Sequence, residues 1–187
     1  MFLHVLGVIG SYGVAIPVFV VTIIGGLALV YRSGMRWAVP SILMALGLWG
    51  WTFGGMGALL DSTITVNQVM HNTQWVVGHF HTYYLMGSVA FTLAYMYHLI
   101  TELSNRNESG ISRMAAWLYG LGSAGFLLMF FLSGANSVPR RYATYLPEWS
   151  TYPTVAVVFV LILSVGLLIL TLEMLGRLKG AWQGTSG

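Results

Sequence analysis

Apolar residues occur along this chain in five long runs, which are separated by short and more polar connections. Each run is long enough for an α-helix to cross the hydrocarbon core of a bilayer, which takes about 20 residues. Lipid tolerates helices and closed barrels, and these runs are too long and continuous for barrel strands. The pattern therefore predicts an all-α, polytopic membrane helix bundle in which residues 1–187 form a single membrane domain. The five transmembrane helices are expected near 4–30, 38–60, 73–100, 113–134 and 153–175.

Composition supports the membrane assignment and excludes several other classes. Of 187 residues, 57% are hydrophobic and 7% are charged, whereas soluble domains average roughly 25% charged residues. The chain has no cysteine, which excludes disulfides and cysteine-bound iron–sulfur clusters. No basic patch accompanies the net charge of +3, so we expect contact with lipid and no nucleic-acid partner. The first run lacks the basic start and cleavage site of a secretory signal and is expected to be a retained span.

Basic residues gather at one end of the expected bundle. Six of the eight lie beside the ends of the first, third and fifth runs, which all face the same side of the membrane. Cytoplasmic loops carry an excess of lysine and arginine. We therefore expect the N-terminus outside and the C-terminus in the cytoplasm, in a cell (plasma) membrane or an inner membrane. The six residues are Arg32, Arg36, Arg106, Arg113, Arg177 and Lys179.

Two histidines within the third run carry the strongest chemical signal. His79 and His81 are two residues apart, which on an α-helix corresponds to a rotation of about 200°. The two imidazoles therefore leave the helix on nearly opposite sides and cannot chelate one ion together. Histidines on opposite faces of an apolar helix predict two metal centres with the helix as a wall between them, which is the geometry of a di-haem electron-transfer site.

Arg140 and Arg141 lie on the outer side, against the general charge bias. They are either two solvated loop arginines or anchors for haem propionates, which arginine can bind through two parallel hydrogen bonds. His71 precedes His79 by eight residues, or about 12 Å along a helix. That distance places His71 towards the arginines, where propionates would lie. The residues alone leave both interpretations of the arginines open.

Three segments resemble one known family in order and at compatible spacing. The segment His71–His81 reads His-Asn-Thr-Gln-Trp-Val-Val-Gly-His-Phe-His and is similar to the tenth-helix signature of haem–copper oxidase subunit I. Thr52–Gly55 resembles the Thr-x-Gly-Gly of its ninth helix, and Pro139–Tyr142 with Tyr145 resembles its Pro-Arg-Arg-Tyr segment. The resemblance covers most of the chain, as helices eight to twelve of a twelve-helix subunit.

The resemblance implies a role for each residue of the histidine triplet. His79 would be the catalytic residue, as the proximal iron ligand of the high-spin haem at the oxygen-reducing site. His81 would be an axial iron ligand of the low-spin haem that receives electrons. Phe80, between the two in sequence, would pack between the macrocycles. The resemblance also implies that His71 contacts a propionate of the high-spin haem and that Arg140 and Arg141 hold propionates of both haems.

The resemblance also implies a companion polypeptide. In the family, the copper ligands and the second low-spin haem ligand lie upstream of the eighth helix, and this chain contains none of that region. We expect a companion membrane chain with the N-terminal helices and copper ligands, other oxidase subunits, and quinol, cytochrome c or a copper protein as electron donor. The chain would be the haem-bearing C-terminal part of a terminal oxidase subunit I that reduces oxygen to water with proton translocation, and would be inactive alone.

Some positions depart from the family pattern. Asn72 stands where many oxidases carry aspartate, and the carboxylate expected after Arg-Arg-Tyr is replaced near Thr144. Magnesium prefers carboxylate oxygens, so these changes argue against an outer magnesium site. The lysine that opens a proton path in the main class of these oxidases would fall near Val21, and no lysine occurs in that run. Thr22 is the candidate hydroxyl for an alternative route.

Three other classes of protein are alternatives to an oxygen reductase. A nitric oxide reductase shares the haem ligation of this family and differs in the substrate gas. A cytochrome b-like electron-transfer subunit carries histidine pairs about a dozen residues apart on two helices, whereas His81 and His98 are 17 apart and no second pair occurs. A structural subunit or transporter would leave the histidine triplet and the arginine pair unexplained.

Overall fold

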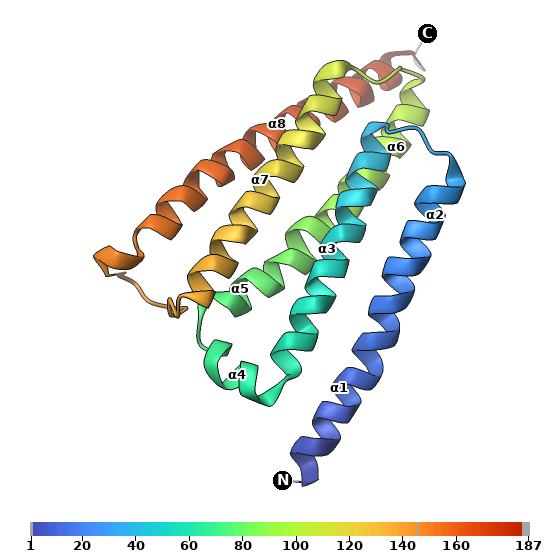
Figure 1. Ribbon diagram of the computed structural model, residues 1–187. Helices are drawn as coiled ribbons and strands as arrows, with labels where there is room; N and C mark the ends of the chain where they lie inside the picture. The colour runs from blue at the N-terminus through green and yellow to red at the C-terminus, as the bar shows by residue number, and fades with distance from the viewer. Residues whose placement is uncertain (1, 145, 185–187) are drawn as a thin grey trace.

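The computed structural model describes residues 2–144 and 146–184, in which long helices run back and forth between two ends of a bundle (Figure 1). No β-strand occurs among these residues, which confirms the all-α prediction. Two of the long helical stretches in the described residues are interrupted by π-helical segments. The elements in order are α1 (Phe2–Val20), η1 (Val21–Gly25), α2 (Gly26–Ser33), α3 (Val39–Ser62), α4 (Ile64–Met70), α5 (Gln74–His81), η2 (Thr82–Val89), α6 (Ala90–Ser104), α7 (Gly110–Ala135), η3 (Pro147–Trp149) and α8 (Thr151–Gly184).

Four helical stretches of the described chain are long and apolar enough to cross a membrane, so this is a multi-pass membrane protein. They are Phe2–Ser33, Val39–Ser62, Gly110–Ala135 and Pro147–Trp182. The remaining expected run, 73–100, lies within the consecutive helical elements α5, η2 and α6, whose histidines and tyrosines make it more polar than the other four. This more polar stretch packs between α3 on one side and α7 on the other, inside the bundle.

The buried core lies between α3, α6, α7 and α8. Small residues allow the helices to approach closely: a side chain on Gly50 would collide with the Met86 backbone, and one on Gly122 would collide with the Leu163 backbone. Such small-residue contacts are the usual basis of helix packing in membranes. The core residues include Val39, Ile42, Leu43, Ala90, Ala94, Tyr97, Ala115, Ala116, Tyr119 and Leu170.

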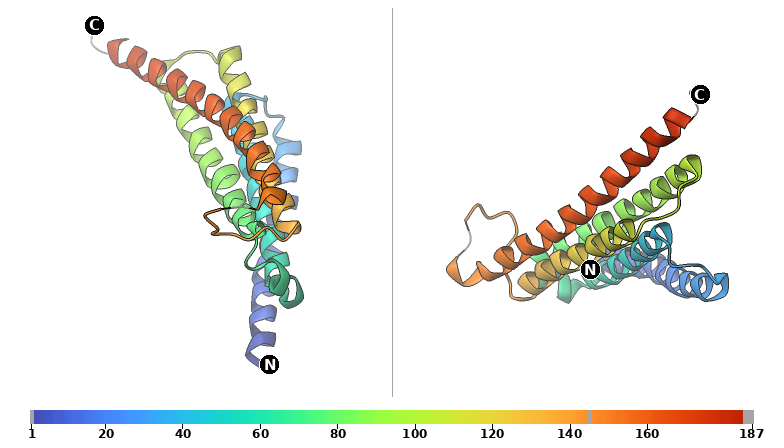
Figure 2. Two further views of the ribbon diagram at one scale, coloured as in Figure 1. Left: turned by 90° about the vertical axis from the view of Figure 1, so that its left-hand side faces the viewer. Right: turned by 90° about the horizontal axis from the view of Figure 1, so that it is seen from above.

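Helix α1 and helix α2 form one edge of the bundle and α8 forms the other (Figures 1 and 2). The most apolar stretch of Phe2–Ser33 has none of its residues buried within this chain, although α1 contacts α3. A long apolar helix that buries so little surface is covered by lipid or by another polypeptide. This edge therefore differs sharply from the packed centre around α5 and α6.

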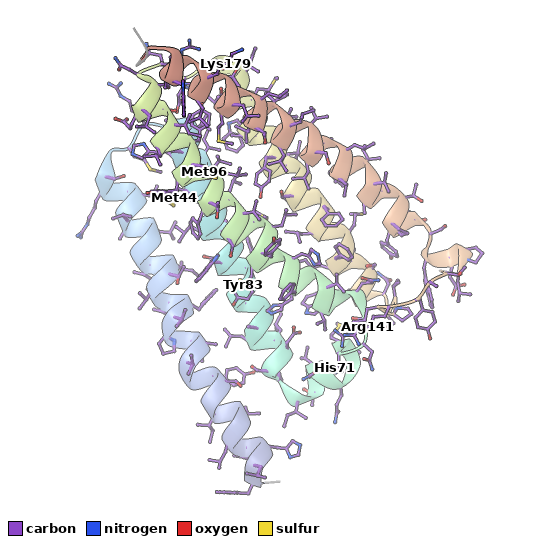
Figure 3. The ribbon with its side chains drawn as sticks, turned by 180° about the vertical axis from the view of Figure 1, so that it is seen from behind. Met44, His71, Tyr83, Met96, Arg141 and Lys179 are labelled. Carbon is purple, nitrogen blue, oxygen red and sulfur yellow. The ribbon has the colours of Figure 1, made fainter. Side chains whose placement is uncertain are left out.

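One sequence-based estimate is wrong, because His71 and His79 do not share a helix. Residues 61–72, expected as a simple connection, contain α4, and the helix then breaks at Thr73. Thr73 has an extended backbone, with φ −98° and ψ 172°, and its side chain accepts a hydrogen bond from the Trp75 amide to start α5. The estimate of about 12 Å along one helix therefore does not apply, although His71 and Arg141 do lie at the same end of the bundle (Figure 3).

The segment before α5 is joined to the connection between α7 and α8. The Gln74 amide donates to the Val138 carbonyl at 2.9 Å, and the Arg140 amide donates to the Asn72 carbonyl at 2.9 Å. Since these bonds link residues more than sixty positions apart, they fix the arginine segment next to the start of the histidine helix. The Asn72 carbonyl is thereby used in a backbone bond.

Candidate functional site

The His79 ring is directed at α3. A Cβ atom added to Gly57 would lie 2.5 Å from the His79 Nδ1, so the ring edge rests directly on the α3 backbone. The same nitrogen lies 4.0 Å from the Oδ2 of Asp61, one turn further along α3. Tyr83 packs edge-on against the ring, with centroids 5.3 Å apart and planes at 89°. Glycine at position 57 is therefore what lets the imidazole approach α3.

The His81 ring is directed at α7. It stacks on Phe130, with centroids 5.7 Å apart and planes at 19°, and it meets Phe126 edge-on at 6.3 Å. These two phenylalanines are one helical turn apart, so they present a continuous aromatic face to the histidine. The rings of His79 and His81 thus face different neighbouring helices, as their spacing of two residues predicts.

Hydrogen bonding distinguishes the two histidines further. The Nδ1 of His81 lies 2.8 Å from the Val77 carbonyl, which can only accept, so this nitrogen carries the proton. The Nε2 of His81 is then the nitrogen with a free lone pair, the usual state of a metal-binding imidazole. The Nδ1 of His79 is buried and has no hydrogen-bond partner among the residues that the structure describes.

A groove beside α5 joins His81 to both arginines. Arg140 carries a buried Nε atom that has no partner within the described part of the chain, so a donor remains available for an anion. Arg141 is exposed and adopts a left-handed backbone with φ 66°. The groove thus brings both arginines to the same side of α5 as His81. The groove is lined by Val76, Val77, Phe80, His81, Arg140 and Arg141.

Phe80 and His71 are the remaining residues expected at the site. Phe80 is 64% exposed and forms part of the groove wall, so its ring is available to an apolar ligand. His71 follows α4 directly and is exposed, at the same end of the molecule as Arg141 and opposite to Lys179 (Figure 3). Tyr145 lies outside the described residues.

Several residues that shape this site carry no recognisable signal of their own in the sequence. Gly57, Phe126 and Phe130 are ordinary members of apolar runs, and only the packing of α3 and α7 against α5 brings them to the histidines. Asp61 is the exception, since a carboxylate at the end of an apolar run is unusual. Within the described residues, no three histidine, aspartate or glutamate side chains converge as a metal ion would need, so each histidine would act as a single protein ligand.

The geometry defines a membrane helix bundle in which two histidines of one helix face different neighbouring helices and one of them shares a groove with two arginines. A sequence model described as "Cytochrome C and Quinol oxidase polypeptide I" matches residues 1–169. The chain therefore belongs to the cytochrome c and quinol oxidase polypeptide I family. This membership confirms the resemblance to haem–copper oxidase subunit I. Haem and copper are the cofactors of this family in general.

Individual relatives agree with the family match. The chain is 28% identical over 167 residues to cytochrome c oxidase polypeptide 1 of Halobacterium salinarum, covering 88% of this chain and 28% of that protein. It is 30% identical over 147 residues to cytochrome c oxidase subunit 1 of Thermus thermophilus, covering 75% and 26%. It is 35% identical over 136 residues to the same subunit of Debaryomyces hansenii, covering 71% and 25%. The chain thus spans about a quarter of the length of these relatives.

A solved structure shares the fold. A cryo-EM structure of a heme-copper terminal oxidase dimer matches with a TM-score of 0.76 and 21% sequence identity. The match covers 94% of this chain and 36% of that one. The bundle of this chain therefore has the fold of one part of that larger structure.

Proposed function

We propose that this chain is the haem-bearing C-terminal part of a terminal oxidase subunit I, which reduces oxygen to water with proton translocation as part of a complex. The observation that carries the proposal is the opposite placement of two imidazoles on one helix. His79 faces α3 and His81 faces α7, so one helix separates two potential iron sites. Without the rest of the subunit the chain would be inactive.

The histidines fit the role of axial ligands. With the Nδ1 proton of His81 held by the Val77 carbonyl, its Nε2 is left to bind the iron of a low-spin haem. His79 would bind the iron of the high-spin haem and would be the catalytic residue. The bound haems would supply the electron transfer and the oxygen chemistry. The protein would set their axial ligation, their separation and the charge around them.

The residues at the polar end of the bundle suit the binding of haem propionates. Arg140 and Arg141 share a groove with His81, and the unused Nε donor of Arg140 suits a carboxylate. His71 would contact a propionate of the high-spin haem. Phe80, exposed between the two ligands, would pack between the macrocycles. The replacements at Asn72 and Thr144 argue against magnesium at this end.

A companion membrane chain would complete both haem sites. It would carry about seven further helices, the histidine ligands of the active-site copper and the second axial ligand of the low-spin haem. The unburied apolar edge formed by α1 and α2 supports such a neighbour. Other oxidase subunits would join the complex, and quinol, cytochrome c or a copper protein would donate electrons. Mass spectrometry of the intact complex should find the companion, and oxidase activity without it would contradict this arrangement.

The orientation follows from the basic residues. Lys179 lies at the end of the bundle opposite to Arg141 and His71 (Figure 3). The excess of basic residues at the Lys179 end supports a cytoplasmic C-terminus and an outer N-terminus in a cell (plasma) or inner membrane. The haem propionates would then lie towards the outer face.

The optical spectrum of the purified complex tests the proposal. Reduced-minus-oxidised spectra should contain two haem components, and carbon monoxide should shift only one of them. Oxygen consumption should exceed nitric oxide consumption. A complex with no haem, or with a single haem, would contradict the proposal. A preference for nitric oxide would instead assign the complex to the nitric oxide reductases. His98→Ala is a suitable control variant, because His98 is an exposed histidine of α6 and should leave both components intact.

A further inference from the structure

Asp61 is a carboxylate in the last turn of α3 that the proposed function does not use. Its side chain is 23% exposed, and its Oδ2 lies 4.0 Å from the Nδ1 of His79. The Trp75 indole N–H also lies close to this carboxylate, and the His71 side chain is the other charged or polar group near it. A carboxylate within an apolar helix is costly unless it has a partner. The Nδ1 of His79, 4.0 Å away, is a buried nitrogen that has no hydrogen-bond partner among the described residues.

The position of the His79 ring favours an interaction with Asp61. Because Gly57 has no side chain, the Nδ1 edge of the ring lies against α3, on the same helix as the carboxylate. The separation of 4.0 Å exceeds a hydrogen bond of 2.7–3.2 Å by roughly 1 Å. A hydrogen bond between the two groups requires a rotation of one or both side chains that closes this difference. The bond would satisfy the buried nitrogen and the carboxylate at once.

We propose that Asp61 is a positioning residue for His79, accepting a hydrogen bond from its Nδ1–H and leaving Nε2 to bind iron. The inference rests on the proposed function, because it assigns His79 as an axial ligand. A carboxylate partner raises the basicity of a ligating imidazole and strengthens its donation to the metal. Asp61 therefore stabilises the oxidised iron on the His79 side.

His79 and His81 differ in the charge of the group that their Nδ1 atoms face. The Nδ1 of His81 is bonded to a neutral carbonyl, whereas that of His79 faces a carboxylate. Hydrogen bonds to ionised groups are roughly twice as strong as neutral ones. The two axial histidines of one helix thus receive different electronic support, and Asp61 makes the His79 iron harder to reduce than a carbonyl partner would.

The test is Asp61→Asn in the complete oxidase complex. The reduction equilibrium of the carbon-monoxide-reactive haem should shift about tenfold towards the reduced state, which is about 59 mV for a one-electron couple. The iron–histidine stretching frequency in resonance Raman spectra should fall. The low-spin haem should keep its potential, and Asp61→Glu should restore much of the wild-type signature. Glu148→Gln, which removes an exposed acid of η3 at the same end of the bundle, should change neither readout.

A second experiment distinguishes the loss of the hydrogen bond from other effects of the Asp61→Asn substitution. In a His79→Gly background, the cavity is filled with imidazole or with N-methylimidazole, which has no N–H. The Asp61→Asn shift should persist with imidazole and vanish with N-methylimidazole. If the shift is equal with both, or if Asp61→Asn leaves the potential and the stretching frequency unchanged, the positioning role is wrong. A wild-type complex with no haem on His79 would instead overturn the proposed function itself.

Discussion

The two sides of helix α5 differ in almost every physical respect although their histidines are two residues apart. On the α7 side, His81 is stacked on Phe130, is bonded to a main-chain carbonyl, and shares a groove with Arg140. On the α3 side, His79 rests on the bare backbone of Gly57 and faces the carboxylate of Asp61. One helix can therefore give two identical side chains different charge, packing and hydrogen-bonding surroundings.

The difference arises from the neighbours and not from α5 itself. Positive charge and aromatic surface come from α7 and the connection that follows it, whereas α3 supplies small residues and one negative charge. Low local dielectric makes such differences count for more than they would in water. A helix between two cofactors can in this way hold two electronic environments within a few ångströms.

The largest expected effect comes from filling the space at Gly57. Gly57→Val places a branched side chain where the His79 ring lies, and over-packing of this kind typically costs about 1–3 kcal/mol or more. We expect loss of the carbon-monoxide-reactive haem with the low-spin haem retained, measured by optical spectroscopy. Gly55→Ala is the control, since a Cβ there meets ordinary van der Waals contacts, with Phe19 at 3.4 Å and with the Tyr83 hydroxyl at 3.8 Å. Equal loss of both haems in Gly57→Val would mean that the two sides of α5 are not independent of each other.

Removing the charge of the groove should have the next largest effect. Arg140→Gln deletes a donor to the propionates, and a hydrogen bond to a charged group contributes about 1.5–3 kcal/mol. We expect lower haem midpoint potentials, most clearly on the His81 side, and a reduced haem content. Arg141→Gln should act in the same direction but less, because Arg141 is the exposed member of the pair. Unchanged potentials and full activity in both variants would make these residues solvated loop arginines.

Loss of the aromatic stacking should have the smallest effect. Phe130→Leu keeps an apolar side chain but removes the stacked ring, which is worth about 0.5–1.5 kcal/mol beyond area burial. We expect a broadened low-spin haem spectrum and an unaltered carbon-monoxide-reactive haem. Phe131→Leu serves as the matched control, because Phe131 packs against Trp75 rather than His81. A larger change in Phe131→Leu would show that the stacking does not hold the His81 ring.

Periodicity predicted the helices and the faces on which their side chains lie, because both of these depend on local sequence. Apolar runs of about 20 residues predict helices, and a spacing of two predicts opposite faces for His79 and His81. Helix α4, which lies in the connection before Thr73, was not predicted, and the shape of this connection depends on backbone bonds such as Arg140 to Asn72. The sequence alone places Asp61 at the end of an apolar run, but its approach to His79 depends on how α3 packs against α5. Contacts between distant segments therefore account for what the sequence did not reveal.

The central claim is that His79 and His81 serve two different haems. The most direct measurement is the reduced-minus-oxidised spectrum, with and without carbon monoxide, of the complexes carrying His79→Ala and His81→Ala. We expect His81→Ala to lack the low-spin component and keep the carbon-monoxide-reactive one, and His79→Ala to show the reverse. Loss of the same single component in both variants would contradict the claim.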